Sequence, residues 1–410
     1  MNRRVVVTGL GVVAPNGNNL EDFWKAIKNG ESAVGPITSF DCSNISCKMA
    51  AEVKDFDPSL HIDRKELKRM DLFSQYAVAA SKMAIEDSGL DTDAVDSERF
   101  GVLIGVGLGG LHTFEKQHKI LLEKGPKRIS PLFIPMMIPN MAAGLVSIMT
   151  GAKGVNECVV TACSSGNNAI GNSFRFIESG EMDIMICGGA EAAITELALG
   201  GFSNMKAVTS SEDPNRASIP FDKERDGFVM GEGSGILILE AYEHAIARGA
   251  EIIAEIKGFA STSDAFHMTA PAENGEGGAR SMKHAIEDAG LVPEDIDYIN
   301  AHGTSTPLND KNETAAIKTV FGEHAYKLNV SSTKSMTGHL LGGAGGVEAV
   351  ISCMAIKDGF IPATANYKVP DEECDLNYTP NNGVEKDITN VLSNSLGFGG
   401  HNSTVIFSKV

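Results

Sequence analysis

Five short segments carry residues that could do chemistry, and the first contains a cysteine. VVTACSSGNNAI, residues 159–170, places Cys163 between an apolar run and a string of small residues. A cysteine at the start of a helix faces unpaired backbone N–H groups and the positive end of the helix dipole. Both favour the nucleophilic thiolate, and the same N–H groups could hold an oxyanion while the small neighbours admit a substrate carbonyl. A buried structural thiol is the alternative, because free cysteines are among the most buried residues.

Two histidines and a lysine follow in the second half of the chain. NAHGTSTPLND, residues 300–310, places His302 directly after an expected strand, where side chains reach the crevice at the end of a sheet. SSTKSMTGHLLGGAGGVEA, residues 331–349, places Lys334 and His339 at the corner before an Ala/Gly-rich helix. Taken singly, the histidines could be bonded to local groups and the lysine could lie at the surface. This corner matches the cysteine corner in kind, so a duplicated fold would make the two corners partners across one site.

Two glycine-rich segments complete the set. NSLGFGGHN, residues 394–402, flanks Phe398 with glycines that permit positive φ and close approach to a ligand, and a plain turn is the alternative. GVGLGG, residues 105–110, follows an expected strand and contains a GxGxxG pattern. It is not the first strand–helix turn and no acidic ribose ligand is evident nearby, so a nucleotide site is weakly supported.

The elements that must position these residues alternate between strand and helix, which predicts an α/β fold. The order repeats: residues 174–192 and 282–304 are analogous, and so are residues 156–177 and 327–356. We therefore expect an internal duplication with its joint near residue 250, dividing the chain into residues 1–250 and 251–410. The polar stretch TSSEDPNRASIPFDKERDG, residues 209–227, is expected to form a long ordered surface loop.

Composition narrows the function classes. The 410 residues, 42% hydrophobic and 21% charged, fit a globular protein too long for one small core. The net charge of −18 disfavours nucleic acid and anionic membranes as partners. No apolar run is long enough for a membrane span, and the N-terminal apolar run is interpreted as a first strand, not a signal peptide. The seven cysteines include no CxxC pair, so reduced thiols in a cytoplasmic protein are expected.

Together the motifs resemble the β-ketoacyl-acyl carrier protein synthases, condensing enzymes of the thiolase superfamily, and most closely their elongating synthase II group. The resemblance covers essentially the whole chain. Its motifs, in family order, are VVTACSSGNNAIG, PFDKERDGFVMGEGSG, NAHGTSTPLND, KSMTGHLLGGAGG and NSLGFGGHNS. It implies a thiolase-like fold of two duplicated βαβαβαββ halves in a five-layer α-β-α-β-α sandwich. It also implies a homodimer that works with acyl carrier protein in fatty acid biosynthesis.

The resemblance implies a decarboxylative Claisen condensation of an acyl-carrier protein with malonyl-carrier protein, giving the 3-oxoacyl product, CO2 and free carrier protein. Cys163 would hold the acyl chain as a thioester, and His302 and His339 would serve the decarboxylation and stabilise the enolate as neutral hydrogen-bond donors. Lys334 would orient this set. The backbone N–H groups of Cys163 and Phe398 would form the oxyanion hole. Relatives that initiate chains have asparagine at the position of His339, so elongation is favoured.

Further residues follow from the resemblance alone. The expected pocket residues are Leu108 as acyl gate, Phe202, Thr304, Thr306 and Gly399. The expected ligands of a structural monovalent cation, Na⁺ or K⁺, are Asn300, Glu348, Ser393 and Asn394, and no other cofactor is expected. Acidic supports near the site are Asp264, Asp310 and Glu313. Two residues depart from the family pattern, Leu396 for phenylalanine and His401 for threonine; neither belongs to the catalytic set, and the resemblance therefore leaves pocket shape and the dynamics of this loop open.

Docking of acyl carrier protein, which is acidic, requires a local basic patch on this acidic chain. The expected docking residues are Arg64, Lys65, Lys68, Arg69, Lys124, Lys127, Arg128 and Lys206, and the alternative for each is a solvated surface charge. A degradative thiolase is disfavoured because the C-terminal glycine motif contains no second cysteine. A non-catalytic chain-length factor is disfavoured because Cys163 is present. A catalytic polyketide ketosynthase and the closely related synthase I stay open, as does the preferred length of the acyl chain.

Overall fold

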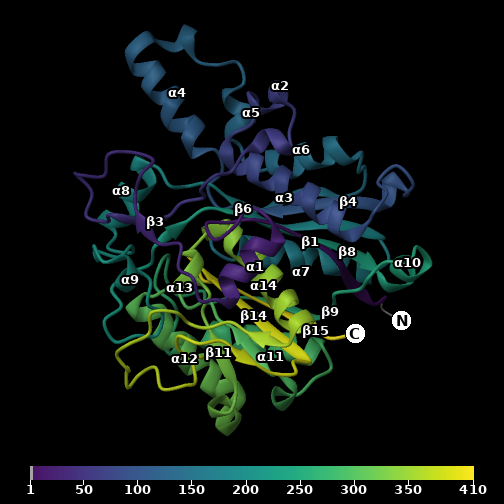
Figure 1. The fold of residues 1–410 in the computed structure, drawn as a ribbon, viewed down its shortest axis with the longest axis vertical. Helices are drawn as coiled ribbons and strands as arrows, with labels where there is room; N and C mark the ends of the chain where they lie inside the picture. The colour runs from purple at the N-terminus through teal and green to yellow at the C-terminus, as the bar shows by residue number, and fades with distance from the viewer. Residues whose placement is uncertain (1–2) are drawn as a thin grey trace.

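A single large sheet forms the centre of the molecule in the computed structural model, which describes residues 3–410 (Figure 1). Its strand order is β11-β10-β14-β15-β9-β1-β8-β6-β4-β5. The strands of the first half are β1 (Val5–Val13), β4 (Phe100–Gly105), β5 (Asn156–Val159), β6 (Ile184–Glu191) and β8 (Gly233–Ala241). Those of the second half are β9 (Ala254–Ser263), β10 (Tyr298–Asn300), β11 (Asn329–Ser331), β14 (Asn390–Gly397) and β15 (His401–Ser408).

The two halves of the sheet repeat one topology. In the first, β8 is antiparallel to β1 and to β6, while β4 is parallel to β6 and to β5. In the second, β15 is antiparallel to β9 and to β14, while β10 is parallel to β14 and to β11. Strands β1 and β9 pair from Val5↔Ile256 to Val7↔Ala254 and join the halves. The predicted duplication of a βαβαβαββ unit is confirmed.

Helices cover and separate the halves in layers (Figure 1). The connecting helices are α3 (Leu72–Ser88), α6 (Met141–Thr150) and α7 (Ser165–Glu178) in the first half, and α11 (Glu276–Asp288), α12 (Pro307–Phe321) and α14 (Ala344–Asp358) in the second. Helices α3 and α6 pack outside the first half-sheet, and α11 with α12 lies outside the second. Helices α7 and α14 contact each other and strands of both halves. This arrangement is the predicted five-layer sandwich.

Glycines allow the two central helices to touch. A side chain on Gly166 in α7 would place its Cβ 2.8 Å from the backbone nitrogen of Gly346, and one on Gly345 in α14 would reach 2.4 Å from the nitrogen of Asn167. Helix α14 is buried on all sides from residue 344 to residue 356, which explains why this part of its sequence is mostly apolar. The starts of α7 and α14, and therefore the two corners before them, are held side by side at the centre of the molecule.

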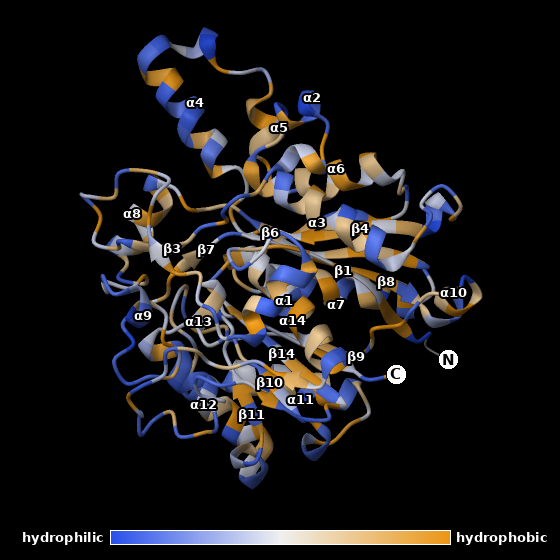
Figure 2. Ribbon diagram, in the orientation of Figure 1, coloured by the Kyte–Doolittle hydropathy of each residue, from blue (hydrophilic) through white to orange (hydrophobic). Residues whose placement is uncertain are grey.

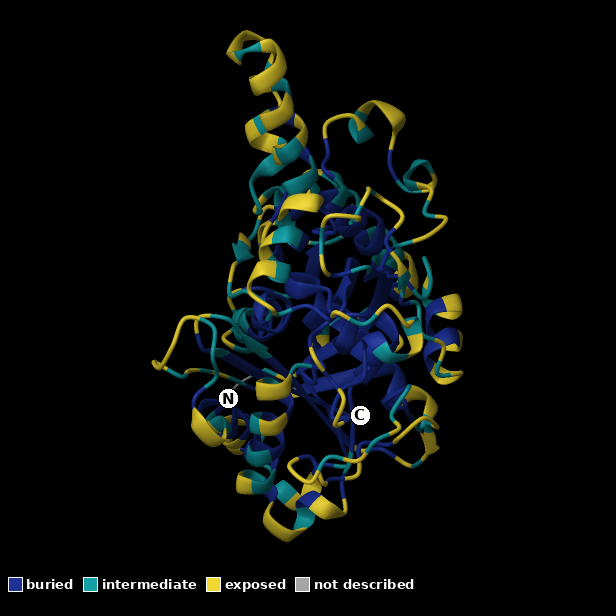
Figure 3. Ribbon diagram, turned by 90° about the vertical axis from the view of Figure 1, so that its left-hand side faces the viewer, coloured by how far each residue is buried: buried dark blue, intermediate teal, exposed yellow. Residues whose placement is uncertain are grey.

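The remaining elements surround this frame. The other helices are α1 (Leu20–Lys28), α2 (Arg64–Leu67), α4 (Leu111–Lys124), α5 (Phe133–Met137), α8 (Glu196–Asn204), α9 (Pro214–Ala217), α10 (Tyr242–Ala247) and α13 (Lys334–Thr337). The short strands are β2 (Gly35–Pro36), β3 (Met49–Ala51), β7 (Met230–Gly231), β12 (Phe360–Ile361) and β13 (Val384–Glu385). Figure 2 shows apolar residues gathered on the central strands, and Figure 3 shows the same strands buried beneath exposed outer helices. None of the helices in residues 3–410 is long and apolar enough to cross a bilayer.

The prediction of a surface loop at residues 209–227 is wrong for its central part. Residues 218–222 are buried, and the ring of Phe221 stacks on that of Tyr378 with centroids 4.0 Å apart. The polar residues of this stretch indicated exposure to solvent. Asp222 is nevertheless fully buried because it pairs with Arg216 at 2.8 Å and accepts backbone N–H groups.

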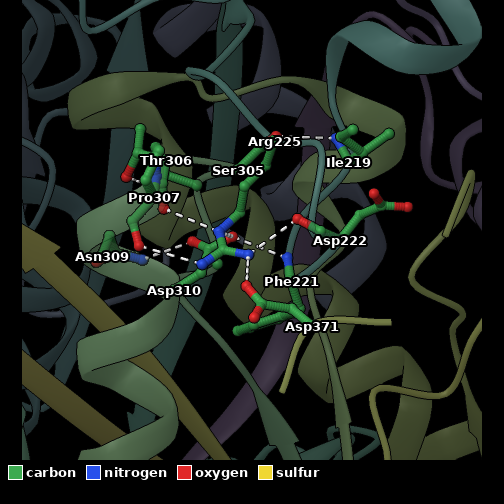
Figure 4. Close-up of polar contacts among 12 residues, drawn as sticks. Ile219, Phe221, Asp222, Arg225, Ser305, Thr306, Pro307, Asn309, Asp310 and Asp371 are labelled. Carbon is green, nitrogen blue, oxygen red and sulfur yellow. Dashed lines mark hydrogen bonds and ion pairs between the residues drawn. The ribbon is translucent and has the colours of Figure 1, made fainter. Parts of the chain in front are cut away.

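Arg225 anchors this segment against the loop that follows β10 (Figure 4). Its guanidinium pairs with Asp371 at 2.6 Å and with Asp310 at 3.6 Å. It also donates to the carbonyl oxygens of Thr306 and Pro307. A buried guanidinium is tolerated only with such partners, so the PFDKERDG stretch acts as an internal brace for the site.

Candidate active site

The cysteine corner is a tight turn fixed by its serines. Cys163 lies between the end of β5 and the start of α7, and it follows Ala162, whose φ of 50° lies in the left-handed region. The hydroxyl of Ser165 donates to the Ala162 carbonyl at 2.6 Å, and that of Ser164 donates to the Ser395 carbonyl at 2.9 Å. The sequence interpreted the small residues as room for a substrate. In the structure Ser164 and Ser165 hold the turn, and Gly166 lets α14 approach.

Reactive atoms from both halves converge on this corner. Cys163 Sγ and a ring nitrogen of each of His302 and His339 all lie within 4.8 Å of one another. The two imidazole rings meet edge to face, with centroids 5.2 Å apart. His302 follows β10, where Glu313 accepts its backbone N–H and that of Gly303, each at 2.8 Å. The backbone N–H of His339 donates to the Val229 carbonyl at 2.7 Å. The backbone thus places the rings and leaves their nitrogens available.

The two histidines are held neutral. Burial is the largest cause that lowers the pKa of each well below 6.5, and the nearby ammonium of Lys334 lowers both further. Within residues 3–410, His302 Nδ1 and both ring nitrogens of His339 are buried without a hydrogen-bond partner. A neutral imidazole offers one N–H donor and one acceptor. These rings can therefore donate to a substrate oxygen that enters the site.

Lys334 is the buried cation of the site. It begins α13, is 1% exposed, and its ammonium pairs with the carboxylate of Glu348 on α14. Burial raises the pKa of Glu348 to about 7, and the attraction of Lys334 opposes that rise. A buried pair of this kind is costly to break because either charge would be left alone in the interior. The pair also ties α13 to α14 beside the histidines.

The thiol of Cys163 is protonated at rest. Burial raises its pKa to about 12, and the carboxylate of Glu191 adds to the rise. Lys334 and the backbone N–H groups of Phe398 and Cys163 oppose it. The sequence predicted a thiolate favoured by the helix N-terminus, but burial outweighs that effect here. The thiol proton must therefore leave as the sulfur reacts, and the neutral imidazoles are within reach to accept it.

A cavity of about 520 Å³ opens onto these groups. It is lined by Cys163, His302, His339 and Phe398, and the expected pocket residues Leu108, Phe202, Thr304 and Thr306 also line it. Gly399 does not: it is exposed, and its N–H donates to the Met268 carbonyl at 2.8 Å. Of the acidic supports, Asp264 and Glu313 line the cavity, while Asp310 lies behind it and accepts the Phe221 N–H. Leu396 lines the cavity as well.

Within residues 3–410, buried polar atoms without hydrogen-bond partners occur on β10, β14 and α14. Asn300 on β10 lies beside Ser393 on β14 in the parallel ladder. In the described part of the chain, both amide atoms of Asn300, Ser393 Oγ and Glu348 Oε2 are buried and lack hydrogen-bond partners. The three oxygens among these atoms fit a hard cation, and the Asn300 nitrogen does not. Asn394 points to the opposite face, because side chains alternate along a strand, and its Oδ1 accepts from Thr404.

The expected docking residues lie on three exposed segments. Lys65, Lys68 and Arg69 lie on α2 and directly after it, and Lys127 and Arg128 lie in the 3₁₀ turn Pro126–Arg128. Arg64 and Lys124, on α2 and α4, are also exposed. Of the eight, Lys206 alone lines the cavity. All are in solvent, and only Lys206 is placed at the mouth of the site by this geometry.

Two residues at the site escaped the sequence interpretation. Phe228 packs edge to face against His339 and Phe202, with ring centroids 5.3 and 5.4 Å apart. Glu191, at the end of β6, is fully buried, and its charge contributes to the raised pKa of Cys163. The signal for Glu191 was its place directly after GGA at the carboxyl end of a buried strand, where acidic side chains reach a crevice.

Known proteins with similar sequences identify the family to which this chain belongs. A family model described as beta-ketoacyl synthase, N-terminal domain, matches residues 2–245, and the corresponding C-terminal domain matches residues 253–368. The chain is 55% identical over 99% of its length to the 3-oxoacyl-[acyl-carrier-protein] synthase 2 of Synechocystis sp., of which 98% is covered. It is 52% identical to the protein of that name from Staphylococcus aureus, covering 100% of this chain and 99% of the relative.

Solved structures share the fold along the whole chain. The ishigamide ketosynthase/chain length factor superposes with a TM-score of 0.95 at 37% identity, covering 100% of both chains. A type II PKS ketosynthase in complex with its acyl-carrier protein superposes with a TM-score of 0.92 at 37% identity, again covering 100% of both.

Proposed function

This chain belongs to the β-ketoacyl synthase family, and from that premise we propose that it is an elongating 3-oxoacyl-[acyl-carrier-protein] synthase of type 2. It is an acyltransferase that joins an acyl chain to a malonyl unit, with both carried on acyl carrier protein, in fatty acid biosynthesis. One observation carries the proposal: a cysteine from one half and two neutral histidines from the other meet within 4.8 Å in one cavity.

Acyl transfer uses the cysteine corner. The sulfur of Cys163 attacks the thioester carbonyl, its proton passes to a neutral imidazole, and the carrier-protein thiolate leaves and takes up a proton. The tetrahedral intermediate carries an oxyanion, which the backbone N–H groups of Cys163 and Phe398 would stabilise. Both N–H groups already face the sulfur and lower its pKa, which supports this role.

Condensation uses the histidines. When the carbon–carboxylate bond of the malonyl thioester breaks, CO2 leaves and its bonding electrons form an enolate. His302 and His339 would donate hydrogen bonds to the enolate oxygen, as their neutral, unpartnered nitrogens allow. The carbanion then attacks the acyl carbonyl on Cys163, the carbon–sulfur bond breaks, and the released thiolate takes up one proton from solvent, which the overall reaction consumes. Lys334 would keep both rings neutral through its charge.

The test is elongation of acyl-carrier proteins from short to long chains with malonyl-carrier protein, followed by mass spectrometry of the products. A fatty acid synthase of this type gives one two-carbon extension for each turnover and stops at the 3-oxoacyl product. Repeated extension without reduction would instead identify a polyketide ketosynthase, the class of the type II PKS ketosynthase that shares this fold. Failure to form either product would contradict the proposed function.

The partner surface and the cation belong to the same proposal. We place carrier-protein docking on the exposed basic residues of α2, on Lys127 and Arg128 of the 3₁₀ turn, and on Lys206 at the cavity mouth. A reversal of charge at Lys65 and Arg69 should weaken turnover with carrier-protein substrates and spare small thioester mimics. A structural Na⁺ or K⁺ would bind Asn300, Ser393 and Glu348, whose buried oxygens lack partners among the described residues.

We further propose a homodimer in the cytoplasm. Strand β5 is a sheet edge with exposed residues at its start, and Val160 directly after it is 55% exposed. Such an edge favours pairing with another chain. The opposite edge, β11, is covered, since Val330 donates to the Asn377 carbonyl at 2.9 Å. All seven cysteines are free thiols, which fits a reducing compartment. Sedimentation of the intact protein at two concentrations tests the dimer.

A further inference from the structure

A buried carboxylate holds the wall of the cavity in place. Glu191 accepts backbone hydrogen bonds from three consecutive residues after β4: Gly107 at 2.8 Å, Leu108 at 3.1 Å and Gly109 at 3.2 Å. It accepts a fourth, at 3.2 Å, from Gly342 in the other half of the chain. Among residues 3–410, no cation forms an ion pair with Glu191 within 4.0 Å, so backbone N–H groups alone satisfy it.

These contacts are tight and leave little freedom to the loop. A Cβ on Gly107 would lie 2.5 Å from Glu191 Oε2, and one on Gly342 would lie 2.2 Å from the Gly107 nitrogen. A carboxylate in the interior is stable only while its hydrogen bonds persist. Burial raises the pKa of Glu191 to about 7, and the same backbone N–H groups oppose that rise because they stabilise the charged form. Movement of residues 107–109 away from Gly342 would therefore leave Glu191 unsatisfied.

The loop and the turn that Glu191 joins are two walls of the cavity. Leu108 lines the cavity and is 42% exposed. Gly342 follows Leu341, which also lines the cavity and has a φ of 48° in the left-handed region. His339 precedes that turn by three residues. One carboxylate thus links the acyl gate of the first half to the histidine corner of the second.

We propose that Glu191 is a positioning residue that sets the acyl-chain selectivity of the cavity by holding the backbone at Leu108 against the turn at Gly342. That the occupant is an acyl chain rests on the proposed function. Glu191 does not touch the reacting atoms in this scheme. It acts through Leu108, which it keeps in the cavity wall and thereby limits entry of long chains.

The test measures access to Cys163 without requiring condensation. The probes are N-ethyl and N-dodecyl iodoacetamide, which alkylate the sulfur with loss of iodide and of the thiol proton. Mass spectrometry of the Cys163 peptide gives the two rates and their ratio. In Glu191→Gln an amide N–H₂ replaces one acceptor and faces the backbone donors, so the loop is released. We expect the dodecyl-to-ethyl ratio to rise about fivefold, the equivalent of one lost hydrogen bond.

Two further variants test whether Glu191 acts through Leu108. Gly107→Ala keeps Glu191 but pushes against its Oε2, and it should raise the ratio in the same direction. Leu108→Ala removes the gate, so adding Glu191→Gln to it should change the ratio little, because the two changes act through one side chain. Full additivity of the two effects would contradict the proposed route.

The matched control is Glu52→Gln. Glu52 is also buried and accepts backbone N–H groups, from Thr38 at 3.0 Å and Ser39 at 2.9 Å, but it does not line the cavity. Its ratio should equal that of the wild type. A ratio in Glu191→Gln that stays within twofold of the wild type, or that falls, would overturn the proposal. If the wild type fails to condense while the ratio still shifts, the proposed function fails and the role of Glu191 stands.

Discussion

The two corners that build the site differ in how the chain reaches the central helix. In the first half, residues 160–164 lead from β5 directly into α7. In the second, residues 332–343 lie between β11 and α14 and contain α13 and a 3₁₀ turn. The corners occupy equivalent places in the duplicated topology. The longer insert brings Lys334 and His339 back over the start of α7, whereas the short corner presents one thiol.

The polar groups of the two corners also differ in how many of them have hydrogen-bond partners. At the first corner the hydroxyls of Ser164 and Ser165 are bonded to the backbone. At the second, both ring nitrogens of His339 are buried without a partner among the described residues, and a charged pair lies beside them. The duplicated strands and helices therefore position both corners, and the longer segment before α14 adds reactive groups to the second. We assign acyl transfer to the first corner and decarboxylation to the second, and this division can be tested.

The largest effect is expected from Cys163→Ala. Removal of the sulfur should lower condensation by at least about a thousandfold, because no acyl intermediate can form. Malonyl decarboxylation, which needs the second corner, should persist. The control is Cys42→Ala, which removes a thiol that is likewise half-buried and lies outside the cavity lining. Condensation by the alanine variant at more than a few per cent of the wild-type rate would refute the assignment of the nucleophile.

The converse change is His339→Ala at the second corner. Loss of one donor to the enolate oxygen should lower malonyl decarboxylation about a hundredfold, while acylation of Cys163 changes by less than about tenfold. Both half-reactions can be followed separately, by CO2 release and by mass of the acylated protein. His324→Ala, a change outside the cavity lining, is the control. Equal losses in the two half-reactions would contradict the assignment of acyl transfer to the first corner and decarboxylation to the second.

A stability comparison follows from the buried pair of the second corner. Lys334→Met leaves the Glu348 carboxyl unpaired in the interior and should lower the free energy of unfolding by about 3 kcal/mol. Lys357→Met breaks an exposed pair with Glu251 and should cost less than about 1 kcal/mol. Urea unfolding of both variants measures the difference. Similar costs would show that the Lys334–Glu348 pair contributes no more than a surface contact.

The last comparison is one of pH, to which the first corner should respond and the second corner should not. Burial raises the pKa of Cys163 to about 12. The rate of its alkylation by iodoacetamide should therefore rise about tenfold for each unit by which the pH increases, as long as the pH stays below that value. Because the pKa of His302 and of His339 lies well below 6.5, both stay neutral and decarboxylation should change less than about twofold between pH 6.5 and 8. A decarboxylation rate that falls by half at about pH 6.5 would indicate ordinary histidines.

Much of this site was predictable from the order of residue types. The repeated pattern of strand, small-residue corner and long helix predicted the duplication, because each such unit must fold back onto a parallel strand in the same way. The motifs around Cys163, His302, Lys334 and His339 predicted the family and its activity. The roles of single residues and the division of the sequence at residue 250 stay predictions.

Other features depended on contacts that no local pattern contains. Phe221 and Asp222 lie in a polar stretch that predicted exposure. They are buried because Arg216 neutralises Asp222, while Arg225 and the loop after β10 provide partners for the polar groups around them. Gly399 matches a pocket motif, yet a hydrogen bond to Met268 directs it to solvent. Hydrophobic periodicity reports which face of an element is apolar, but not which distant charge will neutralise a polar residue.

The sequence by itself determined the layered α/β fold, the family and the set of reactive side chains, since these follow from residue order and type. Tertiary structure alone decided their protonation and their support. Burial turned the expected thiolate of Cys163 into a thiol and kept the histidines neutral, because desolvation depends on every atom packed around a group. Glu191 gained its role in the same way, by meeting a loop and a turn that lie far from it along the chain.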